Sequence, residues 1–83
     1  MKQYRTKLFV VNAVRWTGNN IQELFTFAGP RILGNEETGI LIDNSLENIA
    51  IPCPIGHWVI RGLKGEFYPC DNEVFQAKYE EDK

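Results

Sequence analysis

The single histidine and the two cysteines are the residues of this sequence best suited to nucleophilic chemistry. His57 lies between Cys53 and Cys70 in the chain, and a thiol beside an imidazole base is an arrangement that covalent catalysis uses. No third group that would orient the histidine stands out, and a buried cysteine that acts as a small apolar residue is far commoner. Neither cysteine has the CxxC or Cys/His spacing of a zinc site. We therefore expect no catalytic residue, no metal, no cofactor and no enzymatic activity.

Two pairs of carboxylates, Glu36 with Glu37 and Glu66 with Asp71, are the candidates for acid–base chemistry. Such chemistry requires the pKa values of the two carboxyl groups to be driven apart. The first pair lies in a polar loop, and the second borders turns where a carboxylate usually caps backbone N–H groups. We expect Asp71 to cap a helix.

The segment 62–65 (GLKG) has the glycine content of a phosphate-binding loop, and Arg61 and Lys64 would neutralise charge there. It lacks the GxxxxGK[ST] pattern and precedes a strand-like run rather than a helix. A hairpin turn with an exposed lysine accounts for the same residues.

Cationic and aromatic residues form the one group that suits recognition of a nucleotide. Aromatic rings stack on a base, and guanidinium groups pair with phosphate. Alternate side chains of a strand point to opposite faces, so Arg15 and Trp16 cannot line one pocket unless two protomers share it. The same holds for Trp58 and Arg61. The predicted ligand-binding residues are Arg15, Trp16, Trp58, Arg61, Lys64 and Tyr68.

The elements that must position these residues begin with a strand over residues 7–16 (KLFVVNAVRW). This run is rich in β-branched and aromatic residues, and both of its faces are largely apolar. It predicts a central strand that is covered on both sides.

A two-turn helix is predicted at residues 20–28. Asn20 stands at the N-cap with Glu23 three residues later, and Gly29 with Pro30 ends the helix. The apolar stripe recurs at helical spacing and consists of Ile21, Leu24, Phe25 and Ala28.

Further strands are expected at 31–33, 40–42 and 48–52, where prolines 52 and 54 end the last one, and at 57–61 and 66–69 across the turn 62–65. One helical turn at 73–75 and a closing strand at 76–80 complete the chain. The sequence thus predicts one α+β domain over 1–83, a small curved antiparallel sheet or half-open barrel of four to six strands with one helix after the first strand. Its core is centred on Trp16, Phe25, Trp58 and Phe67.

Length and charge limit the classes of function. Eighty-three residues suffice for one domain, and 43% apolar content is ordinary for a folded chain. A net charge of -2 disfavours sequence-specific binding to nucleic acid, which usually needs a basic face. No apolar run approaches the roughly 18 residues of a membrane span or forms a signal peptide. We expect a cytoplasmic protein with reduced cysteines and no membrane partner.

Four segments resemble a family of small proteins that are common in phage and prophage genomes and have no established activity. Residues 13–20 (AVRWTGNN) resemble the family's AVQWTGDN, and residues 54–62 (PIGHWVIRG) resemble its PGDWIIRG. Residues 64–70 (KGEFYPC) match its KGEFYPC, and residues 74–80 (VFQAKYE) resemble its IFEATYE. The chain departs from the family at two places. Residues 55–57 (IGH) stand where the family usually has Gly-Asp, and residues 71–73 (DNE) stand where it usually has Lys-Pro-Asp. The resemblance implies a phage setting and transfers no mechanism.

In that setting we expect a non-enzymatic counter-defence protein that acts by binding. In one version, a homo-oligomeric sponge sequesters a nucleotide-derived host immune signal at the cationic and aromatic residues named above. The alternative is an inhibitor or adaptor, for example of the anti-CRISPR type, that binds a host protein. Its interface would combine an apolar patch with the acidic loop 35–38.

Overall fold

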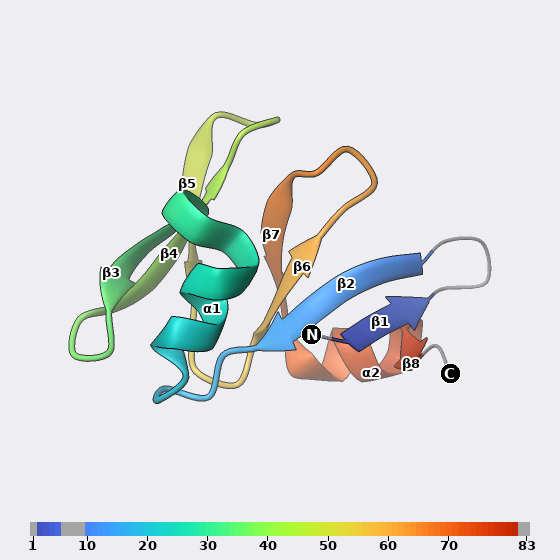
Figure 1. Cartoon of the computed structure of the whole chain (residues 1–83). Helices are drawn as coiled ribbons and strands as arrows, with labels where there is room; N and C mark the ends of the chain where they lie inside the picture. Colours follow the sequence, from blue (N-terminus) through green and yellow to red (C-terminus); the bar gives the residue numbers. More distant parts are fainter. Residues whose placement is uncertain (1, 6–9, 82–83) are drawn as a thin grey trace.

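The computed structural model describes residues 2–5 and 10–81, which form two antiparallel sheets and two α-helices (Figure 1). The five-stranded sheet has the order β7-β6-β2-β1-β8 and the three-stranded sheet the order β3-β4-β5. Neither sheet closes into a barrel. The predicted α+β class with antiparallel strands is confirmed. The finer prediction, one curved sheet or half-open barrel of four to six strands with one helix after the first strand, matches only in part. The strands form two open sheets of five and three strands, and the first of the two helices follows the second strand. The strands are β1 (Lys2–Arg5), β2 (Val10–Arg15), β3 (Ile32–Asn35), β4 (Gly39–Asn44), β5 (Ile49–Cys53), β6 (Trp58–Arg61), β7 (Phe67–Cys70) and β8 (Glu80–Glu81).

Strand β2 is central, as its apolar pattern predicts. Val14 faces helix α1 (Ile21–Ala28), whereas Val11 and Ala13 face helix α2 (Asn72–Lys78), so both faces of the strand are covered. The predicted strand is confirmed for residues 10–15, while residues 7–9 lie outside the described part. Strand β1, which pairs with β2, has no counterpart in the prediction.

The apolar interior consists of two clusters on opposite faces of the five-stranded sheet rather than one. The α1-side cluster lies between this sheet, α1 and the three-stranded sheet, and the α2-side cluster lies between the sheet and α2. The predicted core residues are therefore divided: Trp16 and Phe67 belong to the α1-side cluster and Trp58 to the α2-side cluster. The α1-side cluster comprises Val14, Trp16, Leu24, Phe27, Ala28, Ile32, Ile40, Ile42, Cys53, Val59 and Phe67. The α2-side cluster comprises Val11, Ala13, Trp58, Ile60, Phe75 and Tyr79.

Helix α1 has the predicted bounds, but its buried face is rotated. Phe27 is 8% exposed and packs edge-on against Phe67, with ring centroids 5.5 Å apart, whereas Phe25 is 37% exposed. The prediction that Phe25 lies in the core is wrong, because Leu24, Phe27 and Ala28 form the buried stripe.

The ends of α1 use different devices from a capping box. The Asn20 side chain caps no helical N–H; its Oδ1 accepts from Thr17 N at 2.9 Å and its Nδ2 donates to Glu23 Oε1 at 2.8 Å. Gly29 ends the α-helix with a φ of 57°, a conformation that glycine adopts readily. Pro30 then lies in a 3₁₀ turn, η1 (Gly29–Arg31), which leads into β3.

Helix α2 begins at its predicted cap and runs longer than expected. Asp71 Oδ1 accepts from Glu73 N at 2.8 Å and from Val74 N at 3.2 Å. Phe75 and Tyr79, four residues apart, pack against the five-stranded sheet, which favours helix through Lys78. The predicted closing strand at 76–80 is wrong; only Glu80 and Glu81 pair with β1.

Two Asn residues shape the hairpins of the three-stranded sheet. Asn35 Oδ1 accepts from Glu37 N at 2.8 Å, and Asn44 Oδ1 accepts from Leu46 N at 3.0 Å, as asparagine commonly does in turns. The predicted strands of both hairpins are confirmed with shifts of one or two residues at their ends. The proline at 52 lies inside β5 instead of ending it, which an edge strand tolerates.

Candidate functional site

The six predicted ligand-binding residues do not converge on one pocket. The strand register places Arg15, Trp58 and Tyr68 on the face of the sheet that α2 covers. It places Arg61 on the opposite face, beside the cluster that holds Trp16. Arg15 and Trp16 therefore point to opposite faces, as do Trp58 and Arg61, which is the separation expected from strand alternation. Lys64 lies apart from both groups, in the 62–65 turn.

Both tryptophan rings are packed into the interior. Trp16 is 1% exposed, and Trp58 is 8% exposed and stacks on Phe75 at 3.9 Å between ring centroids. Trp58 Nε1 donates to Asn72 Oδ1 at 2.9 Å. Trp16 Nε1, by contrast, has no hydrogen-bond partner among the described residues. A base has no open tryptophan face to stack on in this arrangement.

Arg15 and Trp58 share a hollow of about 370 Å³ that Lys2 and Glu23 also line. Arg15 is exposed, and its Nε donates to Gly56 O at 3.0 Å. Lys2 forms an ion pair with Glu81 at 3.0 Å. Two cations therefore border this hollow, but Lys2 is already paired with Glu81, and the Glu23 carboxylate also lines the hollow.

The other predicted cations serve packing or solvent contact. The Arg61 guanidinium lies 5.6 Å from the centroid of the Phe27 ring, within the range of a cation–π contact. Lys64 is exposed, and its backbone N–H donates to Glu66 Oε1 at 3.0 Å.

Among the described residues, no hydrogen bond joins the histidine to either thiol, although His57 and Cys70 both lie beside Asp71. His57 Nε2 lies 3.6 Å from Asp71 Oδ2. Cys53 is buried in the α1-side cluster, and burial raises the pKa of its thiol to about 12, so it stays protonated. Cys70 Sγ lies 3.5 Å from Asp71 O, and burial also raises its pKa.

The three-stranded sheet leaves one of its faces uncovered. Its inner face carries Ile32, Ile40 and Ile42 into the α1-side cluster. The register pairs Leu33 with Leu41 and Leu41 with Pro52, so these three side chains form one row on the opposite face. All three are exposed, Leu33 by 41% and Leu41 by 40%. We call this row the outer face.

A cavity of about 440 Å³ lies at one end of the outer face, and we call it the end cavity. Leu41 and Pro52 contribute to it, and Ile55, which is 66% exposed, stands among its lining residues. Its described lining includes two carboxylates and no lysine or arginine. The full lining is Trp16, Glu36, Glu37, Thr38, Gly39, Ile40, Leu41, Pro52, Cys53, Pro54 and Ile55.

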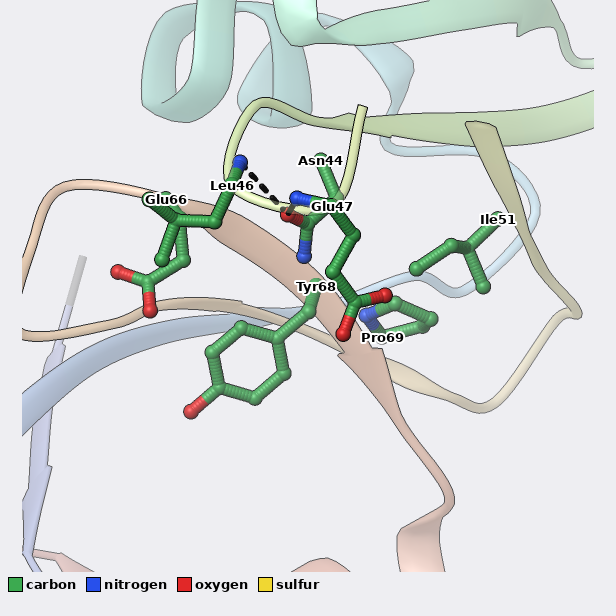
Figure 2. A pocket seen from close by; sticks show the side chains of 7 residues that line it. All are labelled: Asn44, Leu46, Glu47, Ile51, Glu66, Tyr68 and Pro69. Atoms are coloured by element: carbon green, nitrogen blue, oxygen red, sulfur yellow. Dashed lines mark hydrogen bonds between the residues drawn. The ribbon is translucent and has the colours of Figure 1, made fainter. Parts of the chain in front are cut away.

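A smaller pocket, of about 290 Å³, lies where the two sheets meet. Strand β7 is an edge of its sheet, and its side away from β6 lies against β4 and β5. Figure 2 shows Asn44, at the end of β4, and Glu47, in the β4–β5 turn, extending toward Tyr68 and Pro69 of β7. We call this the seam pocket, and its lining is Asn44, Leu46, Glu47, Ile51, Glu66, Tyr68 and Pro69.

Sequence reasoning named the acidic loop 35–38 that lines part of the end cavity, but it did not predict the cavity itself or the seam pocket, because both depend on pairing between strands. The strands at 31–33 and 40–42 are predicted, and with a hairpin register they would place Leu33 beside Leu41. The seam pocket joins the β4–β5 turn to β7, some 20 residues later in the chain, and no local pattern indicates that contact. Only Tyr68, among its residues, belongs to the predicted site.

Comparison with protein-family models, with curated proteins and with solved structures finds no match to this chain. Neither helix of the described part is long and apolar enough to cross a membrane. Within residues 2–5 and 10–81, no group of three or more His, Cys, Asp or Glu side chains is placed to hold a metal ion.

Proposed function

We propose that this chain is a non-enzymatic binding protein that acts through a protein partner, as an inhibitor or adaptor. The observation that carries the proposal is the uncovered outer face, where Leu33, Leu41 and Pro52 lie in one exposed row beside the end cavity. Contiguous exposed apolar side chains that continue into a cavity are typical of protein interaction surfaces. In the phage setting that the resemblance implies, the partner is a host protein.

Charge indicates the kind of partner. Glu36 and Glu37 border the end cavity and are exposed. Within the described residues, the one hydrogen bond to the Glu36 carboxylate is a long one, 3.5 Å from Ile21 N to Oε2. A partner segment that carries Lys or Arg beside apolar residues would complement this surface. The acidic loop 35–38 predicted as an interface thus lies next to the apolar row.

Selection from a random peptide library against the immobilised protein tests the proposal. We expect the selected peptides to combine apolar residues with Lys or Arg. Replacement Leu41→Asp should weaken their binding at least about tenfold, because it places a charge in the apolar row. Glu37→Gln should weaken it a few-fold. Leu63→Asp is the control, because Leu63 is also an exposed leucine, by 64% against 40% for Leu41, but lies in the 62–65 turn.

Two results would overturn this assignment. The first is that the selected peptides bind the Leu41→Asp variant as well as the wild type. The second is a wild-type dimer in sedimentation that Leu41→Asp converts to a monomer, which would assign the outer face to a second copy of the chain.

A second candidate function, binding of a nucleotide-derived signal, is favoured by the hollow that Arg15, Lys2 and Trp58 share. Arginine and lysine pair with phosphate, and the tryptophan edge adds an apolar contact. Calorimetry with cyclic nucleotides and cyclic ADP-ribose isomers tests it. Binding that Arg15→Gln abolishes would support this function, and no binding at high micromolar concentration would remove it.

A further inference from the structure

The seam pocket combines one buried polar group with an acidic rim and apolar walls. Asn44 is 5% exposed, and its Oδ1 accepts from the backbone N–H groups of Leu46 and Glu47, both at 3.0 Å. Its orientation is therefore fixed, and its Nδ2 is left as a donor with no hydrogen bond to the described residues. Figure 2 shows this amide directed into the pocket, toward Tyr68.

The charges around the pocket are negative. The Glu47 side chain is exposed and lines the pocket, and Glu66 supplies a second carboxylate, one oxygen of which accepts from Lys64 N at 3.0 Å. No lysine or arginine is among the described lining residues. A phosphate or carboxylate ligand is disfavoured there, and an organic cation is favoured.

We propose that the seam pocket binds an arginine side chain of the protein partner. Glu47 pairs with the guanidinium group, the half-buried Tyr68 ring stacks against it, and Asn44 Nδ2 donates to the peptide carbonyl of the same arginine. The proposal rests on the proposed function only in that a protein partner supplies the arginine.

Size and chemistry favour arginine over the alternatives. A volume of about 290 Å³ is at the small end of ligand pockets, so one side chain fits it better than a whole nucleotide does. Leu46, Ile51 and Pro69 provide an apolar wall for the methylene stem. Guanidinium is planar and less strongly hydrated than ammonium, and it stacks on aromatic rings while it pairs with a carboxylate.

NMR titration of the ¹⁵N-labelled protein with N-acetyl-arginine N-methylamide tests the proposal. We expect saturable shifts of the backbone amide signals of Leu46, Glu47 and Tyr68, and at least a fivefold loss of affinity, about 1 kcal/mol, in Glu47→Gln. N-acetyl-citrulline N-methylamide, which has nearly the same shape without the charge, should give no comparable shifts. Glu73→Gln is the matched control and should bind the arginine probe as the wild type does, because Glu73 is exposed on α2 and lines neither the seam pocket nor the end cavity.

Three outcomes would overturn the proposal: equal shifts with the citrulline probe, an unchanged arginine response in Glu47→Gln, or spermidine binding tighter than the arginine probe. The last would assign the pocket to free polyamines, which have no peptide carbonyl for Asn44. Because Glu47 lies outside the end cavity and Leu41 lies outside the seam pocket, failure here is distinguishable from failure of the outer-face proposal. The Leu41→Asp variant should still bind the arginine probe.

Discussion

Cys53 shows how one buried side chain couples the fold to pH. It is 2% exposed within the α1-side cluster, and burial raises the pKa of its thiol from 9.0 to about 12. Between these two pH values the unfolded chain loses the thiol proton and the folded chain keeps it. The folded state therefore binds more protons, and its stability falls as the pH rises through this window.

Urea unfolding of the wild type and of Cys53→Ala at about pH 7.5 and about pH 10 measures this coupling. The free energy of unfolding of the wild type should fall by about 1 kcal/mol more than that of the variant between the two conditions. Burial also raises the pKa values of Tyr68 and Cys70, so both proteins should lose some stability. Equal losses in the two proteins would contradict the assignment to Cys53.

The elements show where local sequence suffices and where it fails. The strands and both hairpins of the three-stranded sheet are predictable, because β-branched runs and Asn or Gly turns act over a few residues. At Gly34, where φ is 102°, an added Cβ would clash with Gly39 O. Gly34 lies in β3 and pairs with Ile40, so a glycine is required there for the close approach of the two strands beside their turn. Which face of α1 is buried is not predictable from the local sequence. An apolar stripe through Phe25 and one through Phe27 both contain Leu24 and Ala28, so the pattern does not distinguish them.

Contacts from distant segments decide which face of α1 is buried. Phe27 meets Phe67 of β7 and the Arg61 guanidinium of β6, both more than 30 residues later in the chain. The burial of the predicted site has the same origin. Trp16 and Trp58 have the residue type of a stacking platform, but the second sheet and α2 cover them, and neither covering element is recognisable near them in sequence.

Paired substitutions on α1 test this assignment of its buried face. Phe27→Ala should lower the free energy of unfolding by about 3–5 kcal/mol, because it leaves a cavity in the α1-side cluster. Phe25→Ala, at a side chain that is 37% exposed, should cost less than about 1 kcal/mol. Chemical denaturation measures both. If the Phe27→Ala variant does not fold, the pair Phe27→Leu and Phe25→Leu gives the same ranking, and a larger loss at Phe25 would refute the assignment.

At the scale of the whole molecule, the two clusters share the strands that separate them. Strand β2 contributes Val14 to the α1-side cluster and Val11 to the α2-side cluster, and β6 contributes Val59 and Ile60 in the same way. Loss of either cluster exposes one face of both strands. We therefore expect the predicted single domain to unfold in one cooperative transition, as small domains usually do.

The two tryptophans report on this cooperativity, because Trp16 belongs to one cluster and Trp58 to the other. The indole N–H signals of the folded protein, followed by NMR during urea unfolding, should disappear with the same midpoint. Phe75→Leu removes a ring that stacks on Trp58 and also contacts Tyr4 and Tyr79 in and beside the α2-side cluster. It should lower both midpoints equally, since the destabilised α2-side cluster is coupled to the other through β2 and β6. A Trp16 signal that survives after the Trp58 signal is lost would show instead that the α1-side cluster folds independently of α2.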